Sequence, residues 1–167
     1  AEDIRYYGQW MRDQAWDKIG HLYPTVTGPD GQEHTVIAWI WARTVQSPNP
    51  ANPIETPLVR SWWLSKRKGK EAWIKAEVKD GQVTYEVQHN ADGPKGKDDG
   101  TRIGRAARSL ADDTPITTEY LKAEGQAGRM GAQLMAVVAD SRSGRLYVSP
   151  DEAQAEAASV AAPEDLP

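Results

Sequence analysis

The sequence predicts an α+β domain: an N-terminal helix packed on a mostly antiparallel β-sheet, with two loops that resemble a degenerate zinc ribbon. Residues 3–19 have the three-to-four spacing of an amphipathic helix, whose apolar face comprises Ile4, Tyr7, Met11, Ala15 and Ile19. Residues 74–87 alternate apolar and polar side chains on either side of Asp80-Gly81, which is typical of a β-hairpin. The loops at 47–52 and 109–112 supply the third observation.

The next elements follow in chain order. The segment Val36–Trp41 is β-branched and aromatic almost throughout, which predicts a strand buried on both faces. A proline-rich loop covers residues 47–57, and Leu58–Leu64 predicts another strand. Residues 89–101 have no apolar anchor, so we expect a mobile loop there.

The C-terminal third is less regular. Residues 117–132 are ambiguous, because a helix can start at Thr118 but Gly125, Gly128 and Gly131 would interrupt it. The segments 134–139 and 145–148 predict a second hairpin, and an alanine-rich helix-prone stretch follows Asp151. We therefore divide the chain into a ribbon-like α+β domain, residues 1–150, and an acidic helix-prone tail, residues 151–167.

Composition excludes several classes of protein. The chain has no cysteine, which excludes disulfides and thiol chemistry and is compatible with the cytosol. It has neither the run of about 20 apolar residues that a membrane span needs nor a signal-peptide pattern at its start, so we expect a cytoplasmic protein with no membrane partner. The net charge is −4, yet residues 34–150 carry 17 basic and 13 acidic side chains. This excess of basic side chains is compatible with nucleic-acid binding or with an ordinary solvated surface.

The two ribbon-like loops have the sequences Ser-Pro-Asn-Pro-Ala-Asn (Ser47–Asn52, the first knuckle) and Ser-Leu-Ala-Asp (Ser109–Asp112, the second knuckle). Zinc-ribbon ligands come as two short cysteine pairs separated by a loop. Here the spacing is kept, but the four ligand positions hold Ser47, Asn52, Ser109 and Asp112. Two hydroxyls, an amide and a carboxylate make a poor tetrahedral zinc site, so we expect no bound zinc.

Residues 60–70 form the strongest positive cluster, with five basic side chains around an aromatic pair. Lysine and arginine neutralise phosphates, and tryptophan stacks on exposed bases. Because neighbours on a strand point to opposite faces, one of Trp62 and Trp63 belongs in the core and the other is available at the surface. The alternative is that these tryptophans are core residues and the lysines form a solvated turn. The candidate nucleic-acid contacts are Arg60, Trp63, Lys66, Arg67, Lys68, Lys70, Arg105 and Arg129.

Two of these candidates lie outside the cluster. Arg105 belongs to a basic group directly before the second knuckle. Arg129 lies in a Gly-x-x-Gly-x-x-Gly run, which lacks the preceding strand and the lysine of a phosphate-binding loop. These glycines either let the backbone turn sharply or pack closely, or let it approach a DNA phosphate. The three histidines, at 21, 34 and 89, lack metal spacing and predict surface or capping roles, and no Gly-x-Ser-x-Gly elbow is present.

Five segments, in order, resemble the large prokaryotic adenine-specific DNA methyltransferases that contain a zinc ribbon and are associated with phage defence or restriction-modification. They are RYYGQWM (5–11), IGHLYP (19–24), AWIWARTV (38–45), WLSKRKGK (63–70) and AEGQAGRMG (123–131). In that family the two knuckles carry the cysteine pairs that fall on Ser47, Asn52, Ser109 and Asp112 here. The family's cofactor loop and its (Asn/Asp)-Pro-Pro-Tyr catalytic motif are absent, since Asn49-Pro50 is followed by Ala-Asn.

The resemblance covers nearly all of residues 3–150 and implies an accessory or target-recognition fragment of such an enzyme, with no catalytic residue of its own. S-adenosylmethionine is expected only in the parent enzyme, and the expected partners are double-stranded DNA and the parent's remaining domains. The alternative is a protein–protein interaction scaffold within a methyltransferase or defence complex, without DNA contact. A free-standing enzyme with unrecognised chemistry is the third hypothesis.

Overall fold

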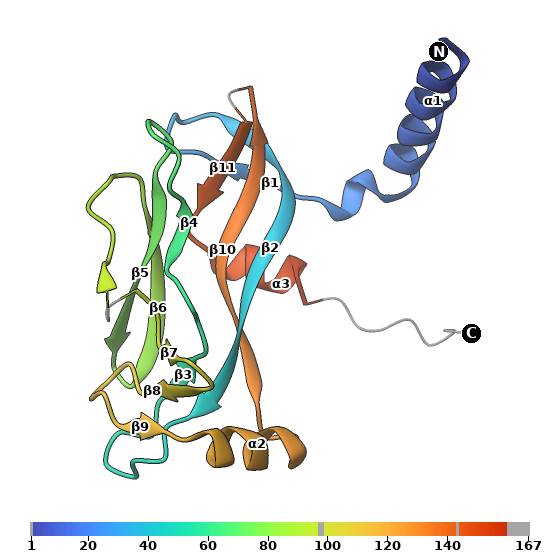
Figure 1. Cartoon of the computed structure of the whole chain (residues 1–167). Helices are drawn as coiled ribbons and strands as arrows, with labels where there is room; N and C mark the ends of the chain where they lie inside the picture. Colours follow the sequence, from blue (N-terminus) through green and yellow to red (C-terminus); the bar gives the residue numbers. More distant parts are fainter. Residues whose placement is uncertain (1, 97–98, 143, 160–167) are drawn as a thin grey trace.

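The computed structural model describes residues 2–96, 99–142 and 144–159, which form a β-sandwich flanked by helices (Figure 1). In the described residues, five strands form the first sheet in the order β1–β2–β10–β11, with β3 paired to the end of β2. Their bounds are β1 Thr25–Thr27, β2 Glu33–Gln46, β3 Glu55–Pro57, β10 Gly131–Ser141 and β11 Gly144–Val148. These strands pair antiparallel, so the predicted α+β class with a mostly antiparallel sheet is confirmed.

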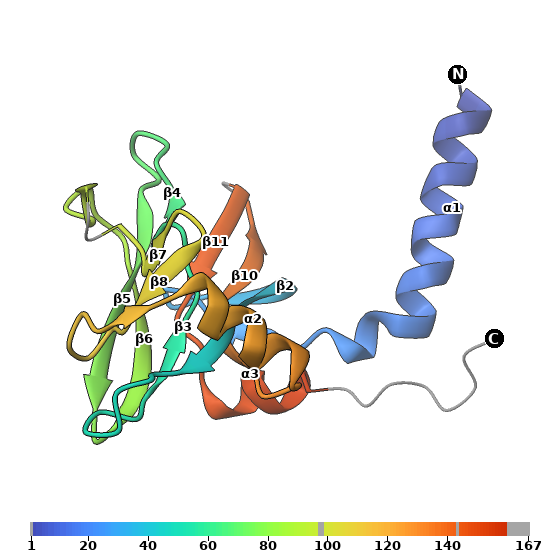
Figure 2. The same ribbon diagram turned by 60° about the horizontal axis from the view of Figure 1, so that its bottom comes forward.

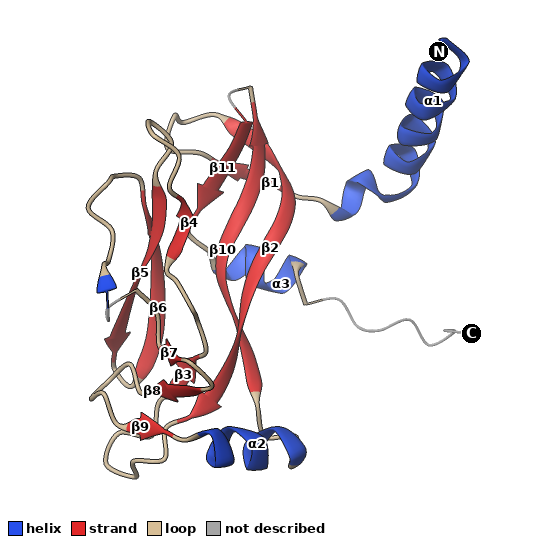
Figure 3. Ribbon diagram, viewed as in Figure 1, coloured by secondary structure: helices blue, strands red, loops and turns tan. Residues whose placement is uncertain are grey.

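The second sheet, β4–β5–β6, packs on the first, and a small third sheet, β7–β8–β9, lies towards one end (Figure 3). Their bounds are β4 Trp63–Ser65, β5 Ala72–Lys79, β6 Gln82–Gln88, β7 Arg102–Ile103, β8 Ala106–Arg108 and β9 Pro115–Ile116. The main core fills the space between the two larger sheets, where Ile74 and Val87 meet Ala42 and Ala136 beside Trp62.

The two predicted hairpins are confirmed. Asp80 and Gly81 both have positive φ, 51° and 76°, the conformation that a tight two-residue turn between β5 and β6 requires. The second hairpin joins β10 to β11. The strand predicted at Leu58–Leu64 is wrong in extent, because only Trp63–Ser65 pairs as β4. The residues before it are held by irregular bonds instead, such as Thr101 N to Val59 O at 2.8 Å.

The long strand β2 departs from its prediction in one respect. Of the predicted segment Val36–Trp41 only Val36 is buried, whereas Ile37 and Trp41 remain 45% and 42% exposed, so the prediction of burial on both faces is wrong. Among the described residues, the short helix α3 (Glu152–Ala157) covers part of the outer face of the sheet, and its Ala155 packs against the cluster that includes Val36. Six helical residues are too few to cover a strand of 14.

Helix α3 also makes the start of the acidic tail part of the folded domain. Gln154 is buried; its side chain accepts a hydrogen bond from Trp39 Nε1 at 3.2 Å and donates one to the Thr25 carbonyl at 3.1 Å. Asp151 caps the helix by accepting from the Gln154 amide at 2.7 Å. The predicted helix after Asp151 is therefore confirmed over 152–157, and residues 160–167 of the tail lie outside the described residues.

The ambiguous segment 117–132 contains helix α2, Thr118–Gln126, and then the start of β10. Thr117 accepts a hydrogen bond from the Tyr120 amide at 3.2 Å and so caps the helix. Gly128 follows with a φ of 68°, where a glycine ends the helix without strain. Leu121 of α2 packs with Val45, Ala107 and Ile116 in a small third cluster.

Helix α1, Glu2–Ile19, forms where the apolar spacing predicts it but does not pack on the sheet. None of its residues is buried, and it projects from the sandwich in both views (Figures 1 and 2). It reaches the sheet only at its C-terminal end, where Trp16 and Ile19 line a shallow groove with Tyr23 and Ile37 before the 3-10 turn η1, Gly20–Leu22. The expected packing of this helix is therefore wrong: its periodicity marks an apolar face, and α3 is the helix that covers the sheet. None of the described helices combines the length and apolar character needed to span a membrane.

Candidate nucleic-acid interface

The strongest cationic feature of the structure is the turn between β4 and β5, here called the basic turn and defined by Lys66, Arg67, Lys68 and Lys70. All four side chains are exposed. The Lys70 amide donates to the Arg67 carbonyl at 2.8 Å, and Gly69 between them has a φ of 74°. The Ser65 hydroxyl accepts from the Arg67 amide at 3.3 Å and fixes the entry to the turn. This tight backbone places four exposed cationic side chains on one short segment.

The two tryptophans before the basic turn divide as the sequence predicts. Trp62 is buried in the main core at 5% exposure, and Trp63 is half-buried. Trp63 Nε1 donates to the Pro94 carbonyl at 3.0 Å, and its ring lies so close to Gly93 that a Cβ there would be 2.3 Å from it. Lys66 Nζ lies 5.4 Å from the ring centroid. Stacking of a base on Trp63 therefore requires Lys66 to move.

The loop 89–101 has polar rather than apolar anchors. Asp99 accepts hydrogen bonds from Ser61 Oγ at 2.7 Å and from the Trp62 amide at 2.9 Å, and Lys66 Nζ lies 3.7 Å from its carboxylate. Thr101 is buried. Residues 97 and 98, also part of the loop predicted to be mobile, lie outside the described residues. These contacts hold the loop against the base of the basic turn and form one wall of a cleft of about 450 Å³ beside Trp63.

The other predicted contacts do not gather with the basic turn. Arg60 is exposed directly before β4, whereas Arg105 lies in the β7–β8 turn and Arg129 follows α2. Figure 1 shows α2 and the β7–β8 turn at the opposite end of the sandwich from the basic turn. Arg129 is also committed to a carboxylate, since its Nη2 and Nε bond the two oxygens of Glu124 at 2.6 and 2.9 Å. That hydrogen bonding lowers the pKa of Glu124 and offsets the charge of Arg129.

The two knuckles lie together at the end of the sandwich that holds α2. Asp112 Oδ2 accepts from Asn49 Nδ2 at 2.6 Å and from Asn52 Nδ2 at 2.9 Å. Each knuckle begins with a buried serine whose Oγ accepts the amide two residues later, from Asn49 in the first and Ala111 in the second, at 3.3 Å in both. The two loops therefore have matching backbone turns and are joined by their side chains.

The residues of the knuckles do not fit a zinc ion. Both serine oxygens accept backbone N–H groups, and one Asp112 oxygen is occupied by two amides. Hydrogen bonds, first that from Asn52, then those from Thr114, lower the pKa of Asp112 well below its usual range, so the carboxylate is charged and satisfied. Within residues 2–96, 99–142 and 144–159, no group of three or more His, Asp or Glu side chains is arranged to hold a metal. Hydrogen bonds join the loops at the place where a ribbon would hold its metal.

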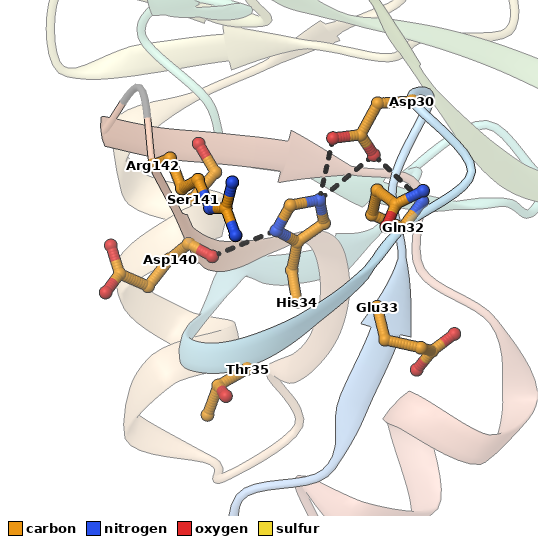
Figure 4. A pocket seen from close by; sticks show the side chains of 8 residues that line it. All are labelled: Asp30, Gln32, Glu33, His34, Thr35, Asp140, Ser141 and Arg142. Carbon is orange, nitrogen blue, oxygen red and sulfur yellow. Dashed lines mark hydrogen bonds and ion pairs between the residues drawn. The ribbon is translucent and has the colours of Figure 1, made fainter.

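A polar cleft of about 750 Å³ lies at the other end of β2, around His34 (Figure 4). His34 Nε2 is 3.0 Å from both carboxylate oxygens of Asp30, and Nδ1 is 3.1 Å from the Asp140 carbonyl oxygen. Both partners only accept hydrogen bonds, so the ring forms both bonds when it is the doubly protonated imidazolium. The hydrogen bond to Asp30 raises the pKa of His34 accordingly.

This arrangement favours a structural clamp over catalysis. A general base needs an unshared ring nitrogen next to a nucleophile. Both nitrogens of His34 are occupied, and Ser141, which lines the same cleft, donates to the Gly144 carbonyl at 2.6 Å. His34 instead joins the β1–β2 loop to the end of β10. The sequence analysis missed this clamp, although the four-residue spacing of Asp30 and His34 across the turn at Gly31 was available as a signal.

No protein-family model, curated protein or solved structure matches the chain in sequence or structural comparison. The interpretation of the surface therefore depends on its own residues. Besides the predicted set, the structure places two further cationic side chains near the basic turn: Lys95, which lines the cleft beside Trp63, and Arg145, from β11.

Proposed function

We propose that this chain binds double-stranded DNA through the basic turn, as an accessory or target-recognition part of an adenine-specific DNA methyltransferase. The observation that carries the DNA-binding proposal is the display of four exposed cationic side chains on one tight turn, Lys66 to Lys70. Lysine and arginine that neutralise phosphates release counterions from the duplex, which supplies most of the affinity of sequence-independent binding. The link to a methyltransferase rests on the resemblance of the five sequence segments.

Within this proposal the chain positions DNA and carries out no chemistry. The backbone of the turn is held by the Ser65 and Arg67 bonds, so the ordering cost on binding comes mainly from the charged side chains. Adenine methylation needs bound S-adenosylmethionine and an extruded base, and the proposal assigns both to other domains of the parent enzyme. Phosphate contacts fix the register of a protein on the duplex but carry no sequence information themselves.

The test is fluorescence anisotropy of a labelled DNA duplex titrated with the full chain at several salt concentrations. If the four cations of the basic turn each neutralise one phosphate, log K falls with log salt at a slope of about −3.6. Affinity then decreases roughly 150-fold between about 50 and 200 mM salt. Replacing Lys66, Arg67 and Lys68 together by Glu should lower the affinity by more than about 100-fold at about 0.1 M salt.

The matched control reverses three cations of α1, Arg5, Arg12 and Lys18, and so changes the net charge equally. DNA affinity that falls as much in the control as in the basic-turn variant would show a diffuse charge effect rather than a site. Unchanged affinity in the basic-turn variant would refute the proposal outright.

A second function, a protein–protein interaction scaffold, is favoured by one specific observation. Helix α1 buries none of its residues, and its large apolar side chains include Trp10 and Trp16 at 53% and 55% exposure. Exposed apolar faces of this kind mark interfaces. In this case binding to the remaining methyltransferase domains would persist at high salt and be lost in a Trp10→Ala, Trp16→Ala variant, whereas DNA binding would be absent.

A further inference from the structure

The start of β11 also contributes to the end of the sandwich that holds the basic turn, here called the cationic end. The start of β11 lies beside the basic turn, since a Cβ placed on Gly144 would lie 3.8 Å from Lys70 Nζ. Arg145 follows Gly144 at the start of β11. The basic turn and the start of β11, about 75 residues apart in sequence, are therefore within contact distance of each other.

The basic turn and β11 enclose a small cleft that is lined by cationic and hydroxyl side chains. Its volume is about 190 Å³, and its walls are formed by Ser65, Arg67, Lys70, Gly144, Arg145 and Tyr147. Three of these side chains are cationic and two are hydroxyls, and no carboxylate is among them. An adjoining cleft of about 170 Å³, which shares Lys70, Arg145 and Tyr147, adds His89 and again contains no carboxylate.

The guanidinium groups of Arg67 and Arg145 lack partners in the part of the chain that the structure describes. The nearest cross-strand neighbour of Arg145 is Asp140, but no ion pair forms between them. By contrast, Arg108 and Arg129 elsewhere in the chain bond to Asp113 and Glu124. Two unpaired guanidiniums facing one cleft repel each other and present several hydrogen-bond donors, a combination that an anion satisfies.

We propose that this cleft binds one phosphate group of the DNA backbone, held between the guanidiniums of Arg67 from the basic turn and Arg145 from β11. The proposal rests on the proposed DNA binding and adds a residue, Arg145, outside the basic turn. Arginine is suited to this role because its planar donor fork matches the oxygens of a phosphate. The hydroxyls of Ser65 and Tyr147 line the same cleft and can donate to a remaining phosphate oxygen. A phosphate held from two sides fixes the position of the sandwich along the duplex.

The test is a double-mutant cycle of Arg67→Ala and Arg145→Ala in the anisotropy titration, with Lys122→Ala as control. Lys122 is an exposed cation on α2, at the other end of the molecule. Two guanidiniums that share one phosphate should lose one phosphate contact together. We expect the double variant to reduce the salt slope by about 0.9 and to bind about eightfold more weakly at about 0.1 M salt.

The other outcomes separate the two proposals. A slope reduced by about 1.8, with roughly 60-fold weaker binding, would mean two independent surface contacts and overturn the shared cleft. If the double variant binds like Lys122→Ala, the cleft is not a phosphate site, and DNA binding would then depend on the three lysines of the basic turn. Failure of the unaltered chain to bind DNA even at low salt overturns both proposals. Both arginines are exposed, and unchanged thermal melting of the variants would confirm that loss of affinity is not loss of fold.

Discussion

The knuckles and the cleft between the basic turn and β11 differ in whether their polar side chains find partners within the protein. At the knuckle end, Asp112 accepts from Asn49 and Asn52, and both buried serines accept backbone amides. In the cleft between the basic turn and β11, by contrast, the exposed Arg67 and Arg145 guanidiniums lack partners among the described residues. Polar groups that satisfy one another hold a fold together, whereas unpaired like charges stabilise nothing until an external anion arrives. We therefore assign stability to the knuckles and binding to the cleft that Arg67 and Arg145 line.

The largest effect is expected from introducing a zinc site at the knuckles. Replacing Ser47, Asn52, Ser109 and Asp112 together by Cys should create a zinc site, because the two loops already have matching turns and touch through Asn52 and Asp112. We expect one zinc per chain, an apparent Kd in the nanomolar range or below, and a large rise in melting temperature. Zinc titration with a colorimetric competitor measures it.

A variant with only Ser47→Cys and Ser109→Cys serves as the control, since two thiolates do not complete a tetrahedral site. If the four-cysteine chain folds but takes up no more zinc than this control, the resemblance of the knuckles to a zinc ribbon is incidental.

The next effect concerns the connection between the two ends. Thr101 is buried, and its Oγ1 accepts from the Val59 amide at 3.0 Å in the segment that joins β3 to β4. Thr101→Val keeps the shape but leaves that amide unsatisfied, so unfolding in urea should show a loss of about 1–3 kcal/mol. Thr84→Val, at an exposed position of β6, should change little. An equal loss in both variants would show a general cost of replacing threonine rather than a role for the buried bond.

A smaller effect should appear on acidification of the knuckle end. The pKa of Asp112 is lowered in the folded chain, so the carboxylate contributes stability above its unfolded value of 3.8 and loses it as pH falls towards the folded pKa. The difference in melting temperature between the unaltered chain and Asp112→Asn should therefore be constant near neutral pH and shrink below about pH 4. A difference that stays constant down to about pH 2 would contradict this role.

The smallest effect is expected at the His34 clamp, which loses its contribution as pH rises and not as pH falls. The pKa of His34 is raised by Asp30, so the pair contributes stability below the unfolded value of 6.5 and loses it as pH rises through the folded pKa. Asp30→Asn should lower the melting temperature at about pH 5.5 and have less effect at about pH 8.5. His89→Gln, at an exposed histidine, provides the comparison; if it reproduces the same pH dependence, the effect does not arise from the clamp.

Much of the local structure could be predicted because it depends on neighbours in sequence. Asp80-Gly81 specifies a two-residue turn through the left-handed backbone that glycine tolerates, and the flanking alternation fixes the hairpin. The basic turn and the division of Trp62 and Trp63 between core and surface follow from residues less than ten positions apart. The two loops that meet at Asn52 and Asp112 are different, because they were selected by their likeness to a zinc ribbon and not by neighbouring residues.

The sequence by itself therefore determined the elements, the turns and the identity of the charged loop, while the tertiary structure decided what each surface faces. An apolar stripe shows which side of α1 avoids water but not what covers it, and the structure places α3 on the sheet instead. The bonds between Asn52 and Asp112 and between His34 and Asp140 span 60 and 106 positions. The same holds for the approach of Arg145 to Arg67. Such contacts depend on how whole sheets pack, because a side chain's partner is set by the position of a distant backbone and not by the residues beside it.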